Sequence, residues 1–182
     1  ASDNTVVGYH AGINNISGAY NTAIGRDALR SNTTASQNTA IGSTALYYNI
    51  SGETNVAVGR QALFNNTTAS NNVAVGYQAL LDNITGTVNT GIGKEALANN
   101  TTGSGNVAVG SQAMLNNLTG GSNTAFGAEA LKNATGNSNT GIGKEAGSQI
   151  TSGANNTIIG RYNGNQGGLD IRTTSNNIVL SD

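Results

Sequence analysis

A short pattern of polar, β-prone and glycine positions recurs along this chain. Its commonest form is Asn-Thr-Ala-Ile-Gly, and successive copies begin 17 residues apart, with one step of 16 between Asn123 and Asn139. The consensus N-[TV]-[AG]-[IV]-G-x-x-A-[LM]-x-x-N-[ITL]-[ST]-[GA]-x-x covers residues 4–160, and a period this regular indicates a repeat architecture. Positions are numbered here from the first Asn of each copy, which is Asn4, Asn21, Asn38, Asn55, Asn72, Asn89, Asn106, Asn123, Asn139 and Asn156.

Positions 2 to 4 of each repeat predict a three-residue strand. Position 2 is Thr or Val and position 4 is almost always Ile or Val, and these β-branched residues favour strands. Alternation places positions 2 and 4 on one face and the small residue at position 3 on the other. Gly at position 5 suits a corner that ends the strand; after Gly8 this column holds Gly25, Gly42, Gly59, Gly76, Gly93, Gly110, Gly127, Gly143 and Gly160.

The second half of the repeat predicts another short strand and a turn. Ala at position 8, followed by Leu or Met, is interpreted as the start of the strand, and Asn-[Ile/Thr]-[Ser/Thr]-[Gly/Ala] as the turn. A helix at Gln-Ala-Leu is the alternative, but flanking Gly and Asn-Thr-Thr leave it too short to be stable.

Short strands with fixed corners predict an all-β fold, a parallel β-solenoid (β-roll) of about ten 17-residue repeats. Stacked coils place identical residues above one another about 4.8 Å apart. Asn at positions 1 and 12 is then expected to form hydrogen-bonded ladders. The predicted structural columns comprise Asn21, Asn38, Asn55, Asn72, Asn89 and Asn106 with Gly25, Gly42, Gly59, Gly76, Gly93 and Gly110.

A 34-residue superperiod overlies the 17-residue period. Position 13 alternates between Ile16, Ile50, Ile84, Leu118 and Thr33, Thr67, Thr101, Ala134. One repeat per coil separates like residues along the stack, whereas two repeats per coil would stack them directly. We favour one repeat per coil. Deleting one repeat distinguishes the two, because it would exchange the faces of a 34-residue coil.

Each repeat offers a core one Ile or Val, one Leu and some Ala or Thr. Burying one large side chain contributes about 1.5–3 kcal/mol, whereas ordering costs about 1.5 kcal/mol per residue. Association with further copies would supply the missing burial. The interface expected is the apolar position-13 column, Ile16, Ile50, Ile84 and Leu118.

Composition excludes several classes of function. The 182 residues include 26 Gly and 29 Asn but no Cys and one His, which excludes disulfide frameworks, Cys metal sites and multi-His metal centres. A net charge of −1 gives no nucleic-acid footprint, and no apolar run is long enough to span a membrane. No metal, cofactor or catalytic residue is predicted.

Candidate chemistry is sparse. Asn-x-Ser/Thr sequons occur at Asn15, Asn32, Asn49, Asn66, Asn83, Asn100, Asn117 and Asn133, and we favour a turn role over glycosylation. His10 near Asp27 is interpreted as an exposed histidine rather than part of a triad. Acids at position 7 (Asp27, Glu95, Glu129, Glu145) are interpreted as solvated charge. Exposed Tyr residues could stack on sugars, and Thr columns could order water, but packing and strand propensity are the preferred explanations.

The Asn-Thr-Ala-Ile-Gly-x-x-Ala unit resembles the head-domain repeats of trimeric autotransporter adhesins, and more closely the Asn-Thr-Ala-Ile-Gly repeats of bacteriophage tail fibres. The resemblance covers residues 4–160 and implies a trimeric β-roll projecting from a surface. The 17-residue period departs from the shorter adhesin period of about fourteen.

Two regions and one structural role are therefore expected. Residues 1–160 form the solenoid and residues 161–182 a terminating cap or transition segment. The expected role is an extracellular fibre or adhesin segment on a virion or cell surface, self-associating as a homotrimer and carrying attachment to surface glycans. The alternatives are the subunit of a filament stacked end to end and, third, a glycan-cleaving β-helix.

Overall fold

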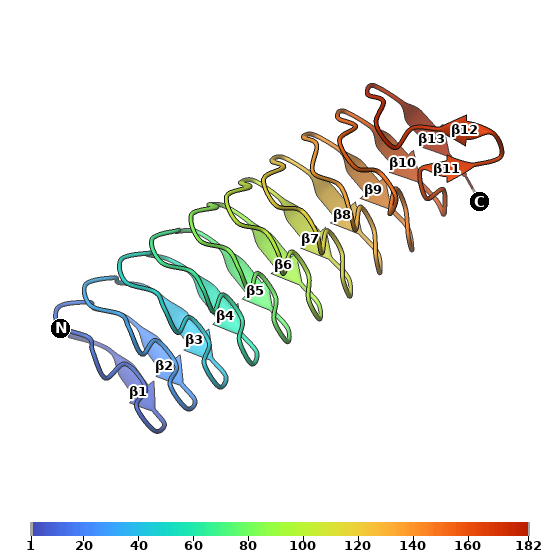
Figure 1. Cartoon of the computed structure of the whole chain (residues 1–182). Coiled ribbons are helices and arrows are strands. Elements are labelled where there is room, and N and C mark those ends of the chain that lie inside the picture. The colour runs from blue at the N-terminus through green and yellow to red at the C-terminus, as the bar shows by residue number, and fades with distance from the viewer. Residues whose placement is uncertain (1, 182) are drawn as a thin grey trace.

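The computed structural model describes residues 2–181 as an all-β solenoid rod (Figure 1). Its strands are β1 (Thr5–Val7), β2 (Thr22–Ile24), β3 (Thr39–Ile41), β4 (Val56–Val58), β5 (Val73–Val75), β6 (Thr90–Ile92), β7 (Val107–Val109), β8 (Thr124–Phe126), β9 (Thr140–Ile142), β10 (Thr157–Ile159), β11 (Asn165–Gln166), β12 (Leu169–Asp170) and β13 (Ile178–Leu180). The sequence-predicted fold class is thereby confirmed.

Each coil contains one repeat. Strands β1 to β10 pair in parallel in chain order, and β13 follows β10, giving one 11-stranded sheet. Register aligns equal repeat positions, so Thr22 faces Thr39 and Thr39 faces Val56. The alternative interpretation, in which two repeats form one 34-residue coil, is therefore wrong. Ten coils at about 4.8 Å each make a rod roughly 48 Å long.

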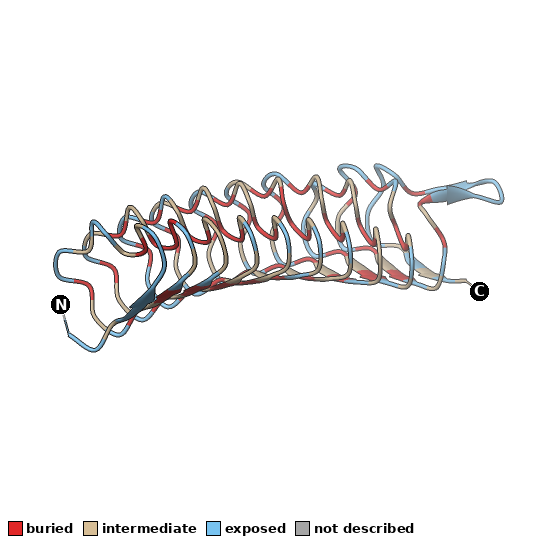
Figure 2. Ribbon diagram, turned by 90° about the horizontal axis from the view of Figure 1, so that it is seen from below, coloured by how far each residue is buried: buried red, intermediate tan, exposed pale blue. Residues whose placement is uncertain are grey.

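The strands bury position 3 and expose position 4. Ala40 in β3 is fully buried, whereas Thr39 is half-buried and Ile41 is 37% exposed. The expectation that the position-4 Ile or Val belongs to the core is thus wrong. The interior is narrow: Figure 2 shows buried residues along the inner columns of the rod, and the sheet contributes mainly Ala or Gly to it.

Positions 8 and 9 form a turn rather than the predicted second strand. Ala28 and Leu29 are both buried, at 0% and 1% exposure. Consecutive residues of a strand point to opposite faces, so a strand would have buried only one of them. Leu29 instead adopts a left-handed conformation, with φ 49°, and both side chains turn inward. Leu or Met at position 9 supplies the one large apolar core residue of most coils.

The glycine corner at position 5 is required by both conformation and space. Gly42 has φ +134°, and a Cβ there would lie 2.6 Å from the carbonyl oxygen of Gly59 in the next coil. A side chain at this position would therefore clash with the backbone of the next coil. The predicted glycine column Gly25 to Gly110 occupies these corners.

The eighth coil lacks one residue, and the structure locates the gap. The backbone N–H of Ala134 donates to Leu131 O as that of Asn117 donates to Met114 O. Ala134 therefore occupies position 12, and Asn133 lies in the position-11 column, where it accepts from Asn116 Nδ2 at 2.7 Å. The sequence alignment that placed Asn133 at position 12 and Ala134 at position 13 is wrong by one residue.

The C-terminal coil is enlarged by an insertion. Residues 161–176 carry the antiparallel hairpin β11–β12, which projects from the C-terminal end of the rod (Figures 1 and 2). Ile171 is buried after the hairpin, and β13 then pairs in parallel with β10. The segment predicted as a terminating cap or transition segment thus contributes β13 to the sheet.

Candidate functional site: the outer faces of the rod

The position-1 asparagines tie successive coils together from inside. The backbone N–H of Asn38 donates to Asn21 Oδ1 at 2.9 Å, and Asn38 Nδ2 donates to Gly52 O at 2.9 Å. This column includes Asn21, Asn38, Asn55, Asn72, Asn89 and Asn106, whose side chains are at most 4% exposed. Buried amides with these partners serve structure and are unavailable to a ligand.

The position-12 asparagines form a second interior ladder. Asn66 Nδ2 donates to Asn49 Oδ1 at 2.8 Å in the preceding coil and to Ala69 O at 3.0 Å in its own. Six of the eight sequon asparagines belong to this buried column, namely Asn32, Asn49, Asn66, Asn83, Asn100 and Asn117. Their amide nitrogens are inaccessible to a glycosylating enzyme in the folded rod. Asn15 and Asn133 are half-buried.

This second ladder ends at a missing partner. Asn117 Nδ2 donates to Asn100 Oδ1 at 3.0 Å and to Gly120 O at 2.9 Å. The next residue of the column is Ala134, which replaces an asparagine and has no side-chain donor for this Oδ1. Among the buried side-chain nitrogen and oxygen atoms of residues 2–181, Asn117 Oδ1 is the one without a hydrogen-bond partner.

The outer face of the sheet is an uncharged surface that runs the length of the rod. It carries Thr or Val at position 2 and Ile, Val or Phe at position 4 in β1 to β10. Ile41, Ile92 and Phe126 are 37%, 39% and 47% exposed. Ten position-4 side chains, about 40% exposed on average, present on the order of 700 Å², close to the roughly 800 Å² per partner of a standard interface.

The position-13 column predicted as an oligomer interface also lies on the surface. Ile16, Ile50, Ile84 and Leu118 are 75%, 48%, 43% and 48% exposed. Thr residues separate them along the stack, and Thr135, rather than Ala134, occupies this column in the eighth coil. This apolar column is therefore interrupted, unlike the one on the sheet.

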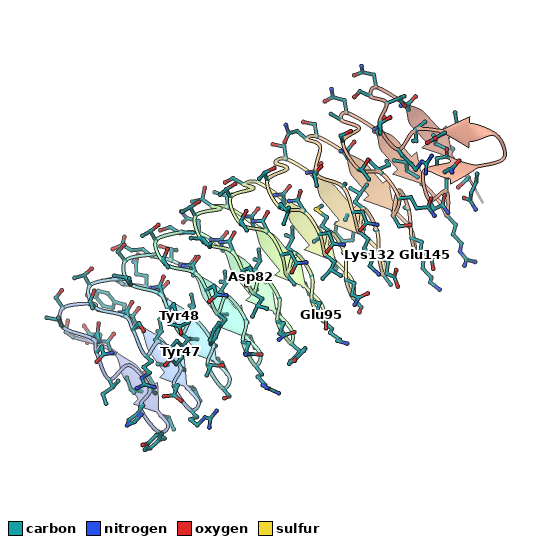
Figure 3. All side chains as sticks on the ribbon, viewed as in Figure 1. Tyr47, Tyr48, Asp82, Glu95, Lys132 and Glu145 are labelled. Carbon is teal, nitrogen blue, oxygen red and sulfur yellow. The ribbon has the colours of Figure 1, made fainter. Side chains whose placement is uncertain are left out.

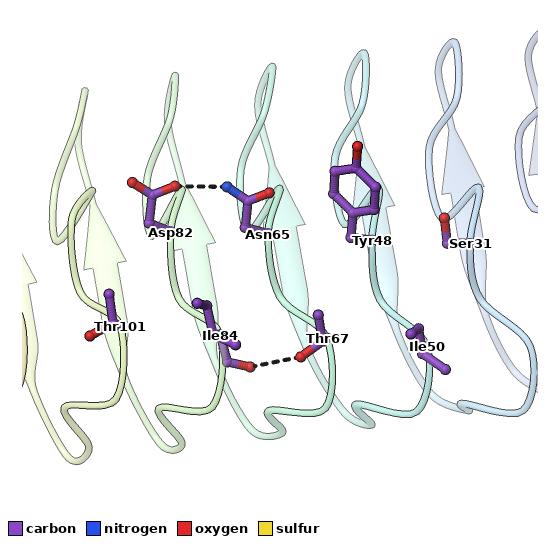
Figure 4. Close-up of a pocket in the computed structure, with 8 residues that line it drawn as sticks. All are labelled: Ser31, Tyr48, Ile50, Asn65, Thr67, Asp82, Ile84 and Thr101. Atoms are coloured by element: carbon purple, nitrogen blue, oxygen red, sulfur yellow. Dashed lines mark hydrogen bonds between the residues drawn. The ribbon is translucent and has the colours of Figure 1, made fainter.

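A groove lies between the position-11 and position-13 columns (Figure 4). It measures about 490 Å³ and extends from the second coil to the sixth. The upper row comprises Ser31, Tyr48, Asn65 and Asp82, and the lower row Ile50, Thr67, Ile84 and Thr101. Asn65 Nδ2 donates to Asp82 Oδ1 at 2.7 Å. Sequence reasoning missed this groove, because it depends on the inward step of the backbone at position 12.

Aromatic side chains gather at one end of this groove. The rings of Tyr47 and Tyr48 meet edge to face with centroids 4.6 Å apart, and Tyr48 and Phe64 meet in the same way at 5.1 Å. Tyr47 Oη accepts from Arg30 Nη1 at 3.0 Å. For Tyr48, the sugar stacking considered for exposed Tyr residues would thus involve a ring that is 45% exposed but held by two neighbours.

The charged residues lie mainly in the turns that follow the strands, where Figure 3 shows Glu95 and Glu145. Glu129 pairs with Lys132 at 3.0 Å, and Glu145 with Lys144 at 3.4 Å. A 2.6 Å hydrogen bond from Gln112 Nε2 is the main cause that lowers the pKa of Glu95.

His10 lies beside a cluster of charged side chains that surrounds Asp27. Asp27 lies 3.3 Å from Arg30, 3.6 Å from Arg26 and 3.6 Å from His10 Nδ1. The His10–Asp27 distance exceeds that of a hydrogen bond, and two arginines already neutralise the carboxylate.

No family model, curated protein or solved structure matches this chain. Within residues 2–181, no helix is long and apolar enough to cross a membrane, and no group of three or more His, Cys, Asp or Glu is arranged to hold a metal ion.

Proposed function

We propose that this chain is a self-associating, rigid segment of an extracellular fibre, of the tail-fibre or adhesin type, that carries attachment to a surface. The observation that carries the proposal is the uncharged apolar outer face of the sheet. Contiguous exposed apolar patches of this size mark interaction sites. The narrow interior, which is lined by Ala and Asn, does not bury this face. The role is structural: the acids Glu129 and Glu145 are each paired with a lysine.

The expected assembly is a homotrimer in which the sheet face is directed toward the partner chains. A trimer follows from the family resemblance, and the choice of face follows from exposure. Position 4 offers an apolar residue in every coil, whereas position 13 offers one only in the first, third, fifth and seventh coils. The continuous column buries more apolar area per coil and therefore contributes more to association.

The test compares two matched double variants by light scattering and analytical ultracentrifugation. V58K/I92K places lysines two coils apart on the sheet face, and I50K/I84K places them two coils apart in the position-13 column. We expect V58K/I92K to dissociate the assembly and I50K/I84K to leave it intact. A parent protein that is a stable folded monomer at high concentration would refute self-association, and the reverse pattern would move the interface to position 13.

A filament of rods joined end to end is the second candidate. Strands β1 and β13 each pair with one neighbour, so both outermost strands of the described sheet have a free edge. Free edges can pair with another chain. Electron microscopy separates the two assemblies, because discrete trimers keep the length of one rod whereas a filament grows with concentration.

A further inference from the structure

We propose that the groove centred on Tyr48, Asn65 and Asp82 binds an uncharged saccharide, at a site distinct from the sheet face. The inference rests on the attachment role proposed above and locates it on one stretch of the rod. Its first support is that Tyr48 is the one aromatic side chain at position 11, which is Asn, Ser, Asp or Gln in the other coils.

The Tyr48 ring is both exposed and fixed. It is 45% exposed, yet edge-to-face contacts with Tyr47 and Phe64 hold its orientation. An immobilised ring binds at a lower entropic cost than a mobile one. Its apolar face suits the C–H face of a pyranose ring, while its hydroxyl offers a hydrogen bond.

Asp82 supplies the polar half of the site. Its Oδ1 accepts from Asn65 Nδ2 at 2.7 Å, and none of the ion pairs formed within residues 2–181 involves Asp82. A carboxylate that is oriented but not neutralised accepts strong charge-assisted hydrogen bonds from hydroxyl groups. The same charge repels carboxylated or sulfated sugars, so an uncharged saccharide is favoured.

The spacing of these groups fits a short linear chain. Tyr48 and Asp82 are two coils apart, about 9.6 Å along the rod, which is the span of roughly two sugar rings. The lower row of the groove alternates Ile50 and Ile84 with Thr67 and Thr101 (Figure 4). This alternation of apolar and hydroxyl groups complements the two kinds of surface on a saccharide.

An extended peptide is a poorer occupant of the same groove. The backbone N–H groups of Tyr48, Asn65 and Asp82 donate to the next coil at 3.1, 2.9 and 2.8 Å. A peptide that adds to a sheet requires free N–H and C=O groups along an edge, and these N–H groups are already paired. Recognition must therefore use the side chains.

The experiment measures binding of defined oligosaccharides to the whole chain by isothermal titration calorimetry and by amide chemical shifts. The uncharged probes are the hexasaccharides of cellulose, chitin, starch and mannan, and the anionic probe is a hexasaccharide of alginate. We expect at least one uncharged probe to bind and to shift amides of residues 48, 65 and 82, and the alginate probe not to bind. The proposal is overturned if no uncharged probe binds, if the shifts lie elsewhere, or if alginate binds best.

Three variants and a control test the assignment. Y48A should weaken binding about fivefold or more, through loss of the ring face, while Y48F, which keeps the ring but lacks the hydroxyl, should restore most of it. D82N retains the shape and an acceptor for Asn65 but removes the charge, and should also weaken binding. Y77A removes another exposed tyrosine, at position 6, and should change nothing. Equal affinity of Y48A and the parent would overturn the site.

The sedimentation behaviour of Y48A and Y48F distinguishes failure of the site from failure of the fibre. A Y48A variant that assembles normally but binds saccharide more weakly than the parent and Y48F supports the groove, whereas a parent protein that assembles but binds none of the probes refutes the groove alone. Loss of assembly with binding retained would refute the fibre proposal alone.

Discussion

The asparagine ladder at position 12 stops at Asn117, and this predicts that two neighbouring, chemically identical substitutions lower the free energy of unfolding by different amounts. Asn100 and Asn117 are consecutive members of the position-12 column, and both are fully buried. N100A and N117A remove the same atoms and leave cavities of the same size. They differ in one respect, because Asn100 Oδ1 accepts from Asn117 Nδ2 at 3.0 Å whereas Asn117 Oδ1 accepts from nothing.

The magnitude follows from the groups that each substitution leaves without a partner. N100A deprives Asn83 Oδ1 of its 2.7 Å donor and one Asn117 N–H of its acceptor, which adds two unsatisfied buried groups. N117A deprives Asn100 Oδ1 of its donor but deletes the oxygen that was already unsatisfied, so the total is unchanged. At about 1–3 kcal/mol for each stranded group, N100A should be the more destabilising by on the order of 2–6 kcal/mol.

The carbonyl partners do not disturb this comparison. Asn100 and Asn117 also donate to Gly103 O and Gly120 O. Those oxygens keep the hydrogen bonds from Asn89 Nδ2 and Asn106 Nδ2, both at 2.8 Å. The two variants therefore lose equal interactions within their own coils.

The assay is guanidinium chloride unfolding followed by far-UV circular dichroism, with amide hydrogen exchange across the affected coils as a local readout. Exchange is needed because a stacked array can unfold in segments, and both substitutions fall in the same segment. N66A, in the middle of the column, should behave like N100A. Equal destabilisation by N100A and N117A, or a larger loss in N117A, would refute the reasoning.

Three further predictions follow from backbone strain, packing and charge. Val88 is 60% exposed and has φ 59°, so V88N should stabilise the rod by about 1 kcal/mol; an unchanged or lower unfolding midpoint would contradict this. G42A should prevent stable folding of its coils, because of its φ and the 2.6 Å approach to the next coil, whereas G167A, where a Cβ meets nothing within 4 Å, should cost far less in the same denaturation assay. Arg172 lowers the pKa of Asp170 to about 2, chiefly through their side-chain hydrogen bonds, so an NMR titration should show the Asp170 carboxylate charged down to about that pH and R172Q should raise its pKa. Because the pKa of Asp170 is lowered in the folded chain, protonation as the pH falls from its ordinary pKa toward about 2 should remove a small stabilising contribution, small because both side chains are half exposed.

The 17-residue period correctly predicted one coil per repeat, and the position-5 glycines correctly predicted the corner that ends each strand. Both predictions depend only on which residue types recur. The orientation of the strand did not follow in the same way. Alternation established that positions 2 and 4 oppose position 3, but it did not say which face lies inside. A usable signal was present: position 3 is Ala or Gly in β2 to β9, whereas position 4 accepts residues as different in size as Val58 and Phe126. A narrow interior restricts volume, and an exposed face does not.

The left-handed turns could not have been predicted in the same way. Position 17 is left-handed in every described coil, yet it holds Tyr20, Thr54 and Val88. Such residues disfavour positive φ, so the local sequence argues against the conformation that the stack imposes. Hydrogen bonds between coils, such as that from Thr54 N to Ser36 O at 3.2 Å, override this local preference. Each coil has to adopt the backbone conformation of its neighbour for these hydrogen bonds to form.

The C-terminal coils show that the rod conserves interior volume rather than particular residues. Gly147 replaces the usual position-9 Leu, and a Cβ there would lie 2.8 Å from Leu131 Cδ2 and 3.2 Å from Ile150 Cδ1. Ile150 and Ile158, both fully buried, stand where Asn and Ala occur in other coils and fill the vacated space. A loss at one position is thus offset from two neighbouring positions, one of them in the next coil.

This division between a constrained interior and a free exterior bears on where function lies. A surface column that repeats in every coil, like position 4, presents the same contact along the whole rod and therefore suits another periodic object, such as a second copy of the chain. A surface feature that occurs once, like Tyr48 beside Asn65 and Asp82, receives no support from the repeat and fits a ligand of limited length. Neither surface feature is needed to hold the interior together. Buried residues such as Ala40 and Asn49 make their contacts inside the rod, and these contacts do not involve the surface side chains. Self-association and ligand recognition can therefore be altered independently on this scaffold, which is why the sheet-face and groove variants are expected to separate the two.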